Sequence, residues 1–147
     1  MCKSPEVRML SLFVPDLAAA TERYGAVLGL EPAQDPGLAP QPHPFAESGP
    51  IVFQLGPVAL ALYQATPSRG THPGDVGIGL AVDDCVRQVA ARAAANGGSV
   101  FFGPERLPED GREMAVFMLP DRHFFELLEQ PTGRPDPDQR ADRTSGR

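Results

Sequence analysis

A strand followed by a helix is predicted twice in this sequence, with the same spacing between the landmarks. Residues 7–28 first alternate apolar and polar or small side chains, as a half-buried strand does, and then repeat apolar side chains at helical spacing. Residues 77–97 follow the same order. The two predicted N-caps are 84 − 16 = 68 residues apart, and the two predicted terminating glycines are 97 − 29 = 68 residues apart: Asp16, Asp84, Gly29 and Gly97. This shared offset indicates an internal repeat.

Further strands are predicted after each helix. They lie at residues 51–55, 58–64, 100–102 and 114–119 and in the stretch 121–130. In the first copy, the strand directly after the helix is poorly defined, because Pro40, Pro42 and Pro44 cannot lie in a central ladder. We expect an irregular edge or a loop near Phe45 there. The fold class predicted is α+β, built from two tandem βαβββ modules.

Composition changes along the chain indicate its organisation. We expect a first module at residues 1–64, a linker at 65–75, a second module at 76–130 and a disordered tail at 131–147. The linker is rich in Pro, Gly, Ser and Thr, and the tail has hardly an apolar side chain to bury. At 147 residues with 41% hydrophobic content, the chain is long enough to form a substantial core.

Glu126 stands within an apolar stretch, DRHFFELLEQ (residues 121–130). A carboxylate buried among such neighbours is costly unless it meets a cation, a metal or several hydrogen-bond donors. The sequence therefore leaves two alternatives. Either Glu126 has a specific partner in the interior, or it lies at the edge of its strand and reaches water.

Charge and cysteine usage narrow the classes of partner. A net charge of −6 argues against nucleic acid and anionic membrane as partners. No segment is long and apolar enough to span a membrane, residues 1–5 lack the form of a signal peptide, and we expect a cytoplasmic location. Cys2 and Cys85 do not suggest a disulfide, and Cys85 is predicted to be a plain surface thiol.

Three short motifs resemble those of the vicinal oxygen chelate superfamily. They are Val14-Pro15-Asp16-Leu17 before the first helix, Leu28-Gly29 at its end, and Asp121-Arg122-His123-Phe124-Phe125-Glu126-Leu127 near the C-terminus. This superfamily includes glyoxalase I, extradiol dioxygenases, fosfomycin-modifying enzymes and bleomycin-resistance binding proteins, and the resemblance spans residues 7–130. It implies curled mixed sheets around a cup-shaped cavity, helices on the outside, and a homodimer.

The resemblance also implies where a metal would bind. Metal-using members carry ligands at positions that correspond to Met9, Ala61, Gly77 and Glu126 in this chain. Only Glu126 offers an ordinary ligand for a divalent metal, because a thioether is soft and weak, while alanine and glycine have no side-chain donor. His72 lies five residues before Gly77, too far to substitute by a small shift. We therefore expect no metal and no other cofactor, with a divalent metal as the disfavoured alternative.

Strand alternation predicts which side chains line the concave face. The set is rich in small and apolar residues, which is typical of a ligand pocket, although close packing against a neighbouring unit is the alternative. The predicted ligand-binding residues are Met9, Ser11, Phe13, Ala61, Tyr63, Gly77, Gly79, Phe124, Glu126 and Leu128, with Ala59 and Ala81 on the same face.

Three functions remain open. The first is a metal-free module that binds an apolar or cationic small molecule, in the manner of the bleomycin-resistance proteins. The second is a lyase, isomerase or dioxygenase-type enzyme of the same superfamily in which Glu126 is a metal ligand or the general acid or base. The third is a structural or regulatory partner protein, which an exposed hydrophobic strand edge would indicate.

Overall fold

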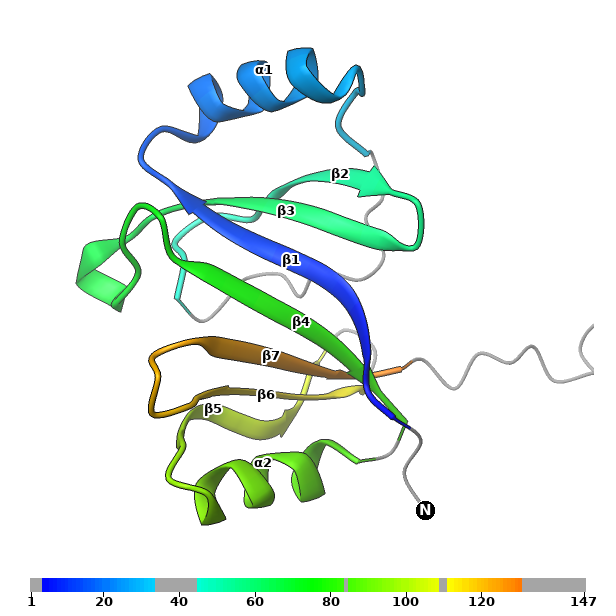
Figure 1. Ribbon diagram of the computed structural model, residues 1–147, viewed down its shortest axis with the longest axis vertical. Coiled ribbons are helices and arrows are strands. Elements are labelled where there is room, and N and C mark those ends of the chain that lie inside the picture. Colours follow the sequence, from blue (N-terminus) through cyan, green and yellow to red (C-terminus); the bar gives the residue numbers. More distant parts are fainter. Residues whose placement is uncertain (1–3, 34–44, 84, 109–110, 131–147) are drawn as a thin grey trace, which may run out of the picture.

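Seven strands form one mixed β-sheet, and two α-helices pack against it (Figure 1). The computed structural model describes residues 4–33, 45–83, 85–108 and 111–130. In chain order the elements are β1 (Glu6–Val14), α1 (Leu17–Leu28), β2 (Ile51–Leu55), β3 (Val58–Gln64), the 3-10 helix η1 (Pro67–Arg69), β4 (Val76–Val82), α2 (Val86–Ala95), β5 (Ser99–Arg106), β6 (Glu113–Met118) and β7 (Phe124–Glu129). The fold class is α+β, as predicted.

The strand order is β2-β3-β1-β4-β7-β6-β5, so among the described residues β2 and β5 are edges and the sheet does not close. The central strands β1 and β4 pair antiparallel. Each central strand also pairs parallel with the last strand of its own half, β1 with β3 and β4 with β7. The strand predicted directly after the first helix falls largely on residues 34–44, outside the described residues, and Phe45 lies in a turn.

The ends of α1 follow the predicted capping pattern. The Asp16 carboxylate accepts a hydrogen bond from the backbone N–H of Ala19 at 3.1 Å, which satisfies one of the first-turn donors. At the other end Gly29 adopts φ 69°, and its N–H donates to the carbonyl of Gly25. The short strand-to-helix link through Pro15 therefore forms as the sequence indicates.

The start of α2 differs from the prediction. The N-cap is Cys85, one residue later than expected, and Asp84 lies outside the described residues. Cys85 is buried in the apolar cluster beneath α2 and is disulfide-bonded, so the predictions of a surface thiol and of no disulfide are both wrong. The reason is its position, because Val82 and Val86 on either side also turn towards the sheet. Cys2 lies outside the described residues.

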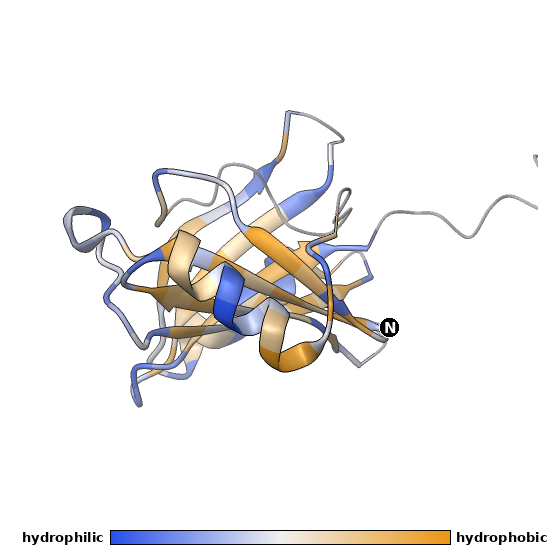
Figure 2. Ribbon diagram, turned by 90° about the horizontal axis from the view of Figure 1, so that it is seen from above, coloured by the Kyte–Doolittle hydropathy of each residue, from blue (hydrophilic) through white to orange (hydrophobic). Residues whose placement is uncertain are grey.

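Three apolar clusters stabilise the fold. One lies between α1 and the strands β1, β2 and β3, and a second lies between α2 and the strands β4, β6 and β7. The third fills the inner face of the sheet, opposite the helices, with side chains from both halves. Figure 2 shows hydrophobic residues on the strands and hydrophilic residues in the loops. None of the described helices is long and apolar enough to cross a membrane.

The turn between β6 and β7 contains a left-handed residue that is not glycine. Arg122 has φ 74°, and its N–H donates to the carbonyl of Leu119 at 2.9 Å. The N–H of Leu119 in turn donates to the carbonyl of His123 at 3.0 Å. Arg122 therefore adopts the left-handed conformation for which glycine is usually favoured.

Candidate functional site

Glu126 lies in the middle of β7 with its side chain on the inner face of the sheet. It is 2% exposed, and its register neighbours are Gly79 on β4 and Val116 on β6. The hydroxyl of Ser11, which is fully buried on β1, donates a hydrogen bond to Oε2 of Glu126 at 2.9 Å. The sequence left open whether Glu126 has a partner in the interior or reaches water at the strand edge. The structure shows the first of these, because Glu126 is buried and has a partner across the sheet.

The bare backbone of β4 makes this hydrogen bond possible. β4 separates β1 from β7, and in the register Gly77 lies between Ser11 and Phe124. A Cβ atom at position 77 would overlap the Phe124 ring and would lie 3.0 Å from Oε1 of Glu126. The Glu126 carboxylate and the Phe124 ring therefore use the space above Gly77 that a side chain would need.

Gly79 has a similar role two register positions away, on the same face of β4. A Cβ atom there would lie 2.8 Å from Cβ of Met9 and 3.4 Å from its terminal methyl carbon. The Met9 side chain therefore packs over the β4 backbone. The predicted pocket space above these two glycines is thus filled by side chains of the same chain.

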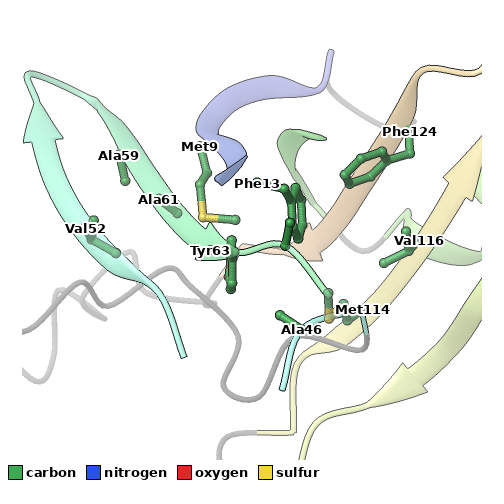
Figure 3. Close-up of a cluster of buried hydrophobic side chains, with 11 residues drawn as sticks. Met9, Phe13, Ala46, Val52, Ala59, Ala61, Tyr63, Met114, Val116 and Phe124 are labelled. Atoms are coloured by element: carbon green, nitrogen blue, oxygen red, sulfur yellow. The ribbon is translucent and has the colours of Figure 1, made fainter. Parts of the chain in front are cut away.

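Aromatic rings form one wall of the site. Tyr63 on β3 stacks on Phe13 of β1 with ring centroids 5.3 Å apart, and Phe13 meets Phe124 of β7 at 5.7 Å. Figure 3 shows these three rings within one cluster that joins strands of both halves. Burial, and secondly the negative charge of Glu126, raise the pKa of the Tyr63 phenol well above its ordinary value. Tyr63 is therefore a neutral phenol beside a carboxylate.

A cavity of about 30 Å³ lies beside Glu126. Its lining includes the long side chains Arg8, Met9, Arg112, Met114 and Leu128, which come from β1, β6, β7 and the residue before β6. A water molecule needs roughly 10–15 Å³ of such space, so the cavity has room for about two waters. Among the described residues, the inner face is therefore a packed core with a small void at Glu126.

The ten predicted ligand-binding residues share this inner face. All are buried except Leu128, which is half-buried against the same apolar cluster. The sequence did not identify Met114 and Val116 of β6 as residues of this inner face. Residues 114–119 are all apolar, so no alternation shows which side chains face inwards. The side chains of the neighbouring residues Arg112 and Glu113 have different surroundings. Arg112 lines the cavity, whereas Glu113 accepts a hydrogen bond from Nε of Arg87 in α2 at 2.7 Å.

The four positions at which the resemblance puts metal ligands do lie on this face. Their donor chemistry is nevertheless poor, because Glu126 provides a carboxylate while Met9, Ala61 and Gly77 provide no oxygen or nitrogen side-chain donor. Throughout the part of the chain that the structure describes, His, Cys, Asp and Glu form no group of three or more suited to a metal ion. These residues do not fit a hard divalent cation.

Several solved structures have a similar fold. A hypothetical protein from Bacillus halodurans is 15% identical with a TM-score of 0.62, and the match covers 91% of this chain and all (100%) of that one. The Mn(II)-bound glyoxalase from Novosphingobium aromaticivorans is 23% identical with a TM-score of 0.61, covering 88% of this chain and 40% of that one. A variant of methylmalonyl-CoA epimerase from Streptomyces coelicolor, in complex with 2-nitronate-propionyl-CoA, is 17% identical with a TM-score of 0.57. That match covers 86% of this chain and 98% of the epimerase chain.

At these identities the likeness shows the fold alone. No curated protein is similar enough to this chain to match it. The family is shown by a sequence model, which matches residues 7–127 and so includes most of β1 and most of β7. This chain belongs to the Glyoxalase/Bleomycin resistance protein/Dioxygenase superfamily.

Proposed function

We propose that this protein binds a small molecule without a metal, on the inner face of its two modules, and that Glu126 anchors the ligand. The observation that carries the proposal is the hydrogen bond from Ser11 to the buried Glu126 across Gly77. A carboxylate in an apolar, aromatic-walled interior favours a ligand that brings a positive charge or strong donors to it. The chemistry of the four metal positions supports a binding role of the bleomycin-resistance kind.

Binding must enlarge the cavity at Glu126. Small-molecule sites usually have volumes of roughly 300–1,000 Å³, whereas this cavity has about 30 Å³. The side chains around it can give way, because Met9 and Met114 are unbranched and flexible, and Arg8 and Arg112 have long aliphatic stems. We infer that the ligand displaces these four side chains and leaves the Ser11–Glu126 pair as the fixed point of the site.

Matched probes and variants test this role. The purified chain is first analysed for metals. Its binding of phenethylammonium and of the uncharged 2-phenylethanol is then measured by calorimetry in buffer that contains a metal chelator. We expect the cation to bind at least about tenfold more tightly, a difference of about 1.4 kcal/mol. Glu126→Gln should abolish that preference. Glu105→Gln, the same change at an exposed residue of β5, should retain it.

Two results would count against the proposal. One is a metal ion bound in stoichiometric amount and lost in Glu126→Gln. The other is a charge preference that is the same in Glu126→Gln and in the unmodified protein. Either result would leave the fold and the family membership untouched, because those rest on other observations.

The neutral phenol of Tyr63 beside Glu126 favours a second candidate, an enzyme of the same superfamily. A carboxylate and a phenol at one site could act as base and acid in a lyase or isomerase reaction. Turnover of candidate substrates, detected by NMR in buffer that contains a metal chelator, would favour this candidate. Tyr63→Phe should then lower kcat more than it changes KM. Tight uptake with full recovery of the intact ligand would favour the binding protein.

A further inference from the structure

Four residues with charged side chains line the cavity beside the Ser11–Glu126 hydrogen bond. They are Glu126 itself, Arg8, Arg112 and Glu129. The other residues of the lining are apolar or glycine, apart from Gln130. In such surroundings the charges of the protein interact strongly with any charge that a ligand brings. The four charged groups therefore decide which class of ligand the site can hold.

Glu129 and Arg8 have partners of opposite charge outside the cavity lining. Oε2 of Glu129 accepts a hydrogen bond from the backbone N–H of Glu113 at 2.9 Å and lies 3.9 Å from Nη1 of Arg106 on β5. Nη2 of Arg8 lies 2.6 Å from Oε2 of Glu6, and both of these side chains reach solvent. These two groups therefore contribute little net charge to the interior of the cavity.

Arg112 is placed more deeply than Arg8. It stands directly before β6, is half-buried, and its Nη1 atom is inaccessible to solvent. A guanidinium keeps its proton in proteins, so the buried nitrogen belongs to a permanent cation. The buried carboxylate of the lining is Glu126, which the Ser11 hydroxyl holds in place. Arg112 and Glu126 thus provide charges of opposite sign at one cavity.

A ligand that enters this cavity must move these two groups apart. The cavity has about 30 Å³, whereas a small-molecule site needs roughly 300 Å³ or more. An uncharged ligand would leave both charges facing an enlarged apolar space, and a ligand with a single charge would leave one of them. A buried charge without a partner strongly disfavours the state that contains it. A ligand that carries both charges avoids this cost.

We propose that the ligand is a zwitterion of the amino-acid class, whose ammonium group binds Glu126 and whose carboxylate binds Arg112. This inference rests on the proposed function, since it adds a second anchor to the same site. Arginine suits the role because its planar fork donates two parallel hydrogen bonds to a carboxylate, which can replace the contacts it makes in the closed cavity. Its long stem lets the guanidinium stay beside the ligand after the cavity has widened.

The rest of this ligand is apolar. Apart from the charged residues and Gln130, the lining offers apolar contacts, and its largest members are Met9, Met114, Leu80 and Leu128. Methionine side chains are flexible and adapt to the shape of a ring or a chain. An amino acid with an apolar side chain is therefore favoured over one with a polar side chain.

Three related probes separate the two anchors. Phenylalanine carries both charges, phenethylammonium lacks the carboxylate, and 3-phenylpropanoate lacks the ammonium group. Their binding to the full chain is measured by calorimetry near pH 7 in buffer that contains a metal chelator, with the tighter-binding enantiomer of phenylalanine. We expect phenylalanine to bind at least about tenfold more tightly than either of the other two.

Variants assign each difference to a residue. Arg112→Gln should abolish the advantage of phenylalanine over phenethylammonium and retain its advantage over 3-phenylpropanoate. Arg112→Lys, which keeps the charge without the fork, should retain part of the first advantage. Arg23→Gln is the matched control, because it makes the Gln change at an exposed residue of α1 outside the cavity lining, and it should retain both.

A measurement on the unmodified protein covers the case in which Arg112→Gln does not fold, which circular dichroism detects. Nitrogen NMR of the arginine side chains should show the Arg112 signal shifting with phenylalanine and with 3-phenylpropanoate. The shift with phenethylammonium should be much smaller, because that probe has no carboxylate for the guanidinium to bind. An Arg112 signal that responds equally to all three probes would contradict the assignment.

The inference is overturned if phenylalanine binds no more tightly than phenethylammonium, or if this advantage is the same in Arg112→Gln. Either result leaves the role of Glu126 intact. Failure of the proposed function has a different signature: phenylalanine would keep the same advantage over 3-phenylpropanoate in Glu126→Gln, or would have none in the unmodified protein. That result would remove the ammonium half of the inference as well.

Discussion

At the scale of single residues, the site depends on the groups that interact with the buried carboxylate of Glu126. Glu126 meets the hydroxyl of Ser11 across the sheet, and its charge reaches Tyr63 on β3. A buried carboxylate left without such donors would cost several kcal/mol, roughly the size of a large mutational effect. Ser11 and Glu126 are 115 residues apart in sequence, so their pairing is a product of the fold.

The raised pKa of Tyr63 predicts a loss of stability at alkaline pH. The unfolded state releases the phenol proton near pH 10, while the folded state retains it. The free energy of unfolding contributed by this difference is constant below pH 10 and falls as the pH rises above it, by up to about 1.4 kcal/mol per pH unit. Urea unfolding of the protein between pH 8 and pH 11 measures this slope.

Tyr63→Phe should remove this part of the alkaline slope, even if the change in packing shifts stability at all pH values. Tyr24→Phe is the matched control, because Tyr24 is the other tyrosine of the chain and is only half-buried, and it should retain the slope. Equal slopes in the unmodified protein and Tyr63→Phe would contradict the assignment.

At the scale of elements, β4 is the strand on which the site is built. It pairs with both β1 and β7, and its two inner glycines allow side chains from those strands to lie over it. Glycine usually weakens a strand, because it adds unfolded-state entropy and buries no side chain. Here that cost is offset by the packing of Phe124 and Met9 onto the bare backbone of the two glycines.

Gly77→Ala should therefore destabilise the protein, although alanine favours a strand more than glycine does. The new methyl group would overlap the Phe124 ring and crowd Glu126, and overpacking of this kind costs about 1–3 kcal/mol. Urea unfolding measures the loss. In a Phe124→Leu background the cost should shrink, because the smaller side chain can give way.

Gly25→Ala is a control in α1. There the new methyl group meets the Leu30 carbonyl at 3.2 Å and gains up to about 1 kcal/mol of helix propensity, so little net loss is expected. A Gly77→Ala protein as stable as the unmodified one would show that the space above β4 is not filled as described.

At the scale of the whole molecule, the two halves of the chain share one inner cluster. Met9, Phe13 and Tyr63 of the first half pack with Met114 and Phe124 of the second, and β1 pairs with β4 along the middle of the sheet. Neither half can bury its inner face without the other. The described residues should therefore unfold together, even though the sequence divides into two similar parts.

Calorimetry can test this cooperativity. We expect a single transition with a calorimetric enthalpy equal to the van't Hoff enthalpy. Residues 1–75 and 76–147 prepared separately should each lack a cooperative transition. Two resolved transitions in the intact chain, or a fragment that melts cooperatively, would show that the modules are independent domains.

The elements and the inner face could be read from the sequence because both follow from local periodicity. Alternation in residues 7–14 and 77–82 predicted β1 and β4, and helical spacing and caps predicted α1. The same alternation placed Ser11 on the inner face, whereas the family resemblance placed Glu126 there. The prediction for Cys85 was wrong because burial just before a helix depends on how the helix docks. A strand that is apolar on both faces, such as β6, has no parity to read.

The sequence by itself determined the strand and helix pattern and the position of a carboxylate within an apolar strand, since both follow from residue types and their spacing. Only the tertiary structure decided that Ser11 meets Glu126, that Phe124 and Met9 fill the space above Gly77 and Gly79, and that the cavity is small. The physical reason is that these features depend on contacts between strands far apart in the chain, where differences of one or two ångströms decide whether space is open or filled.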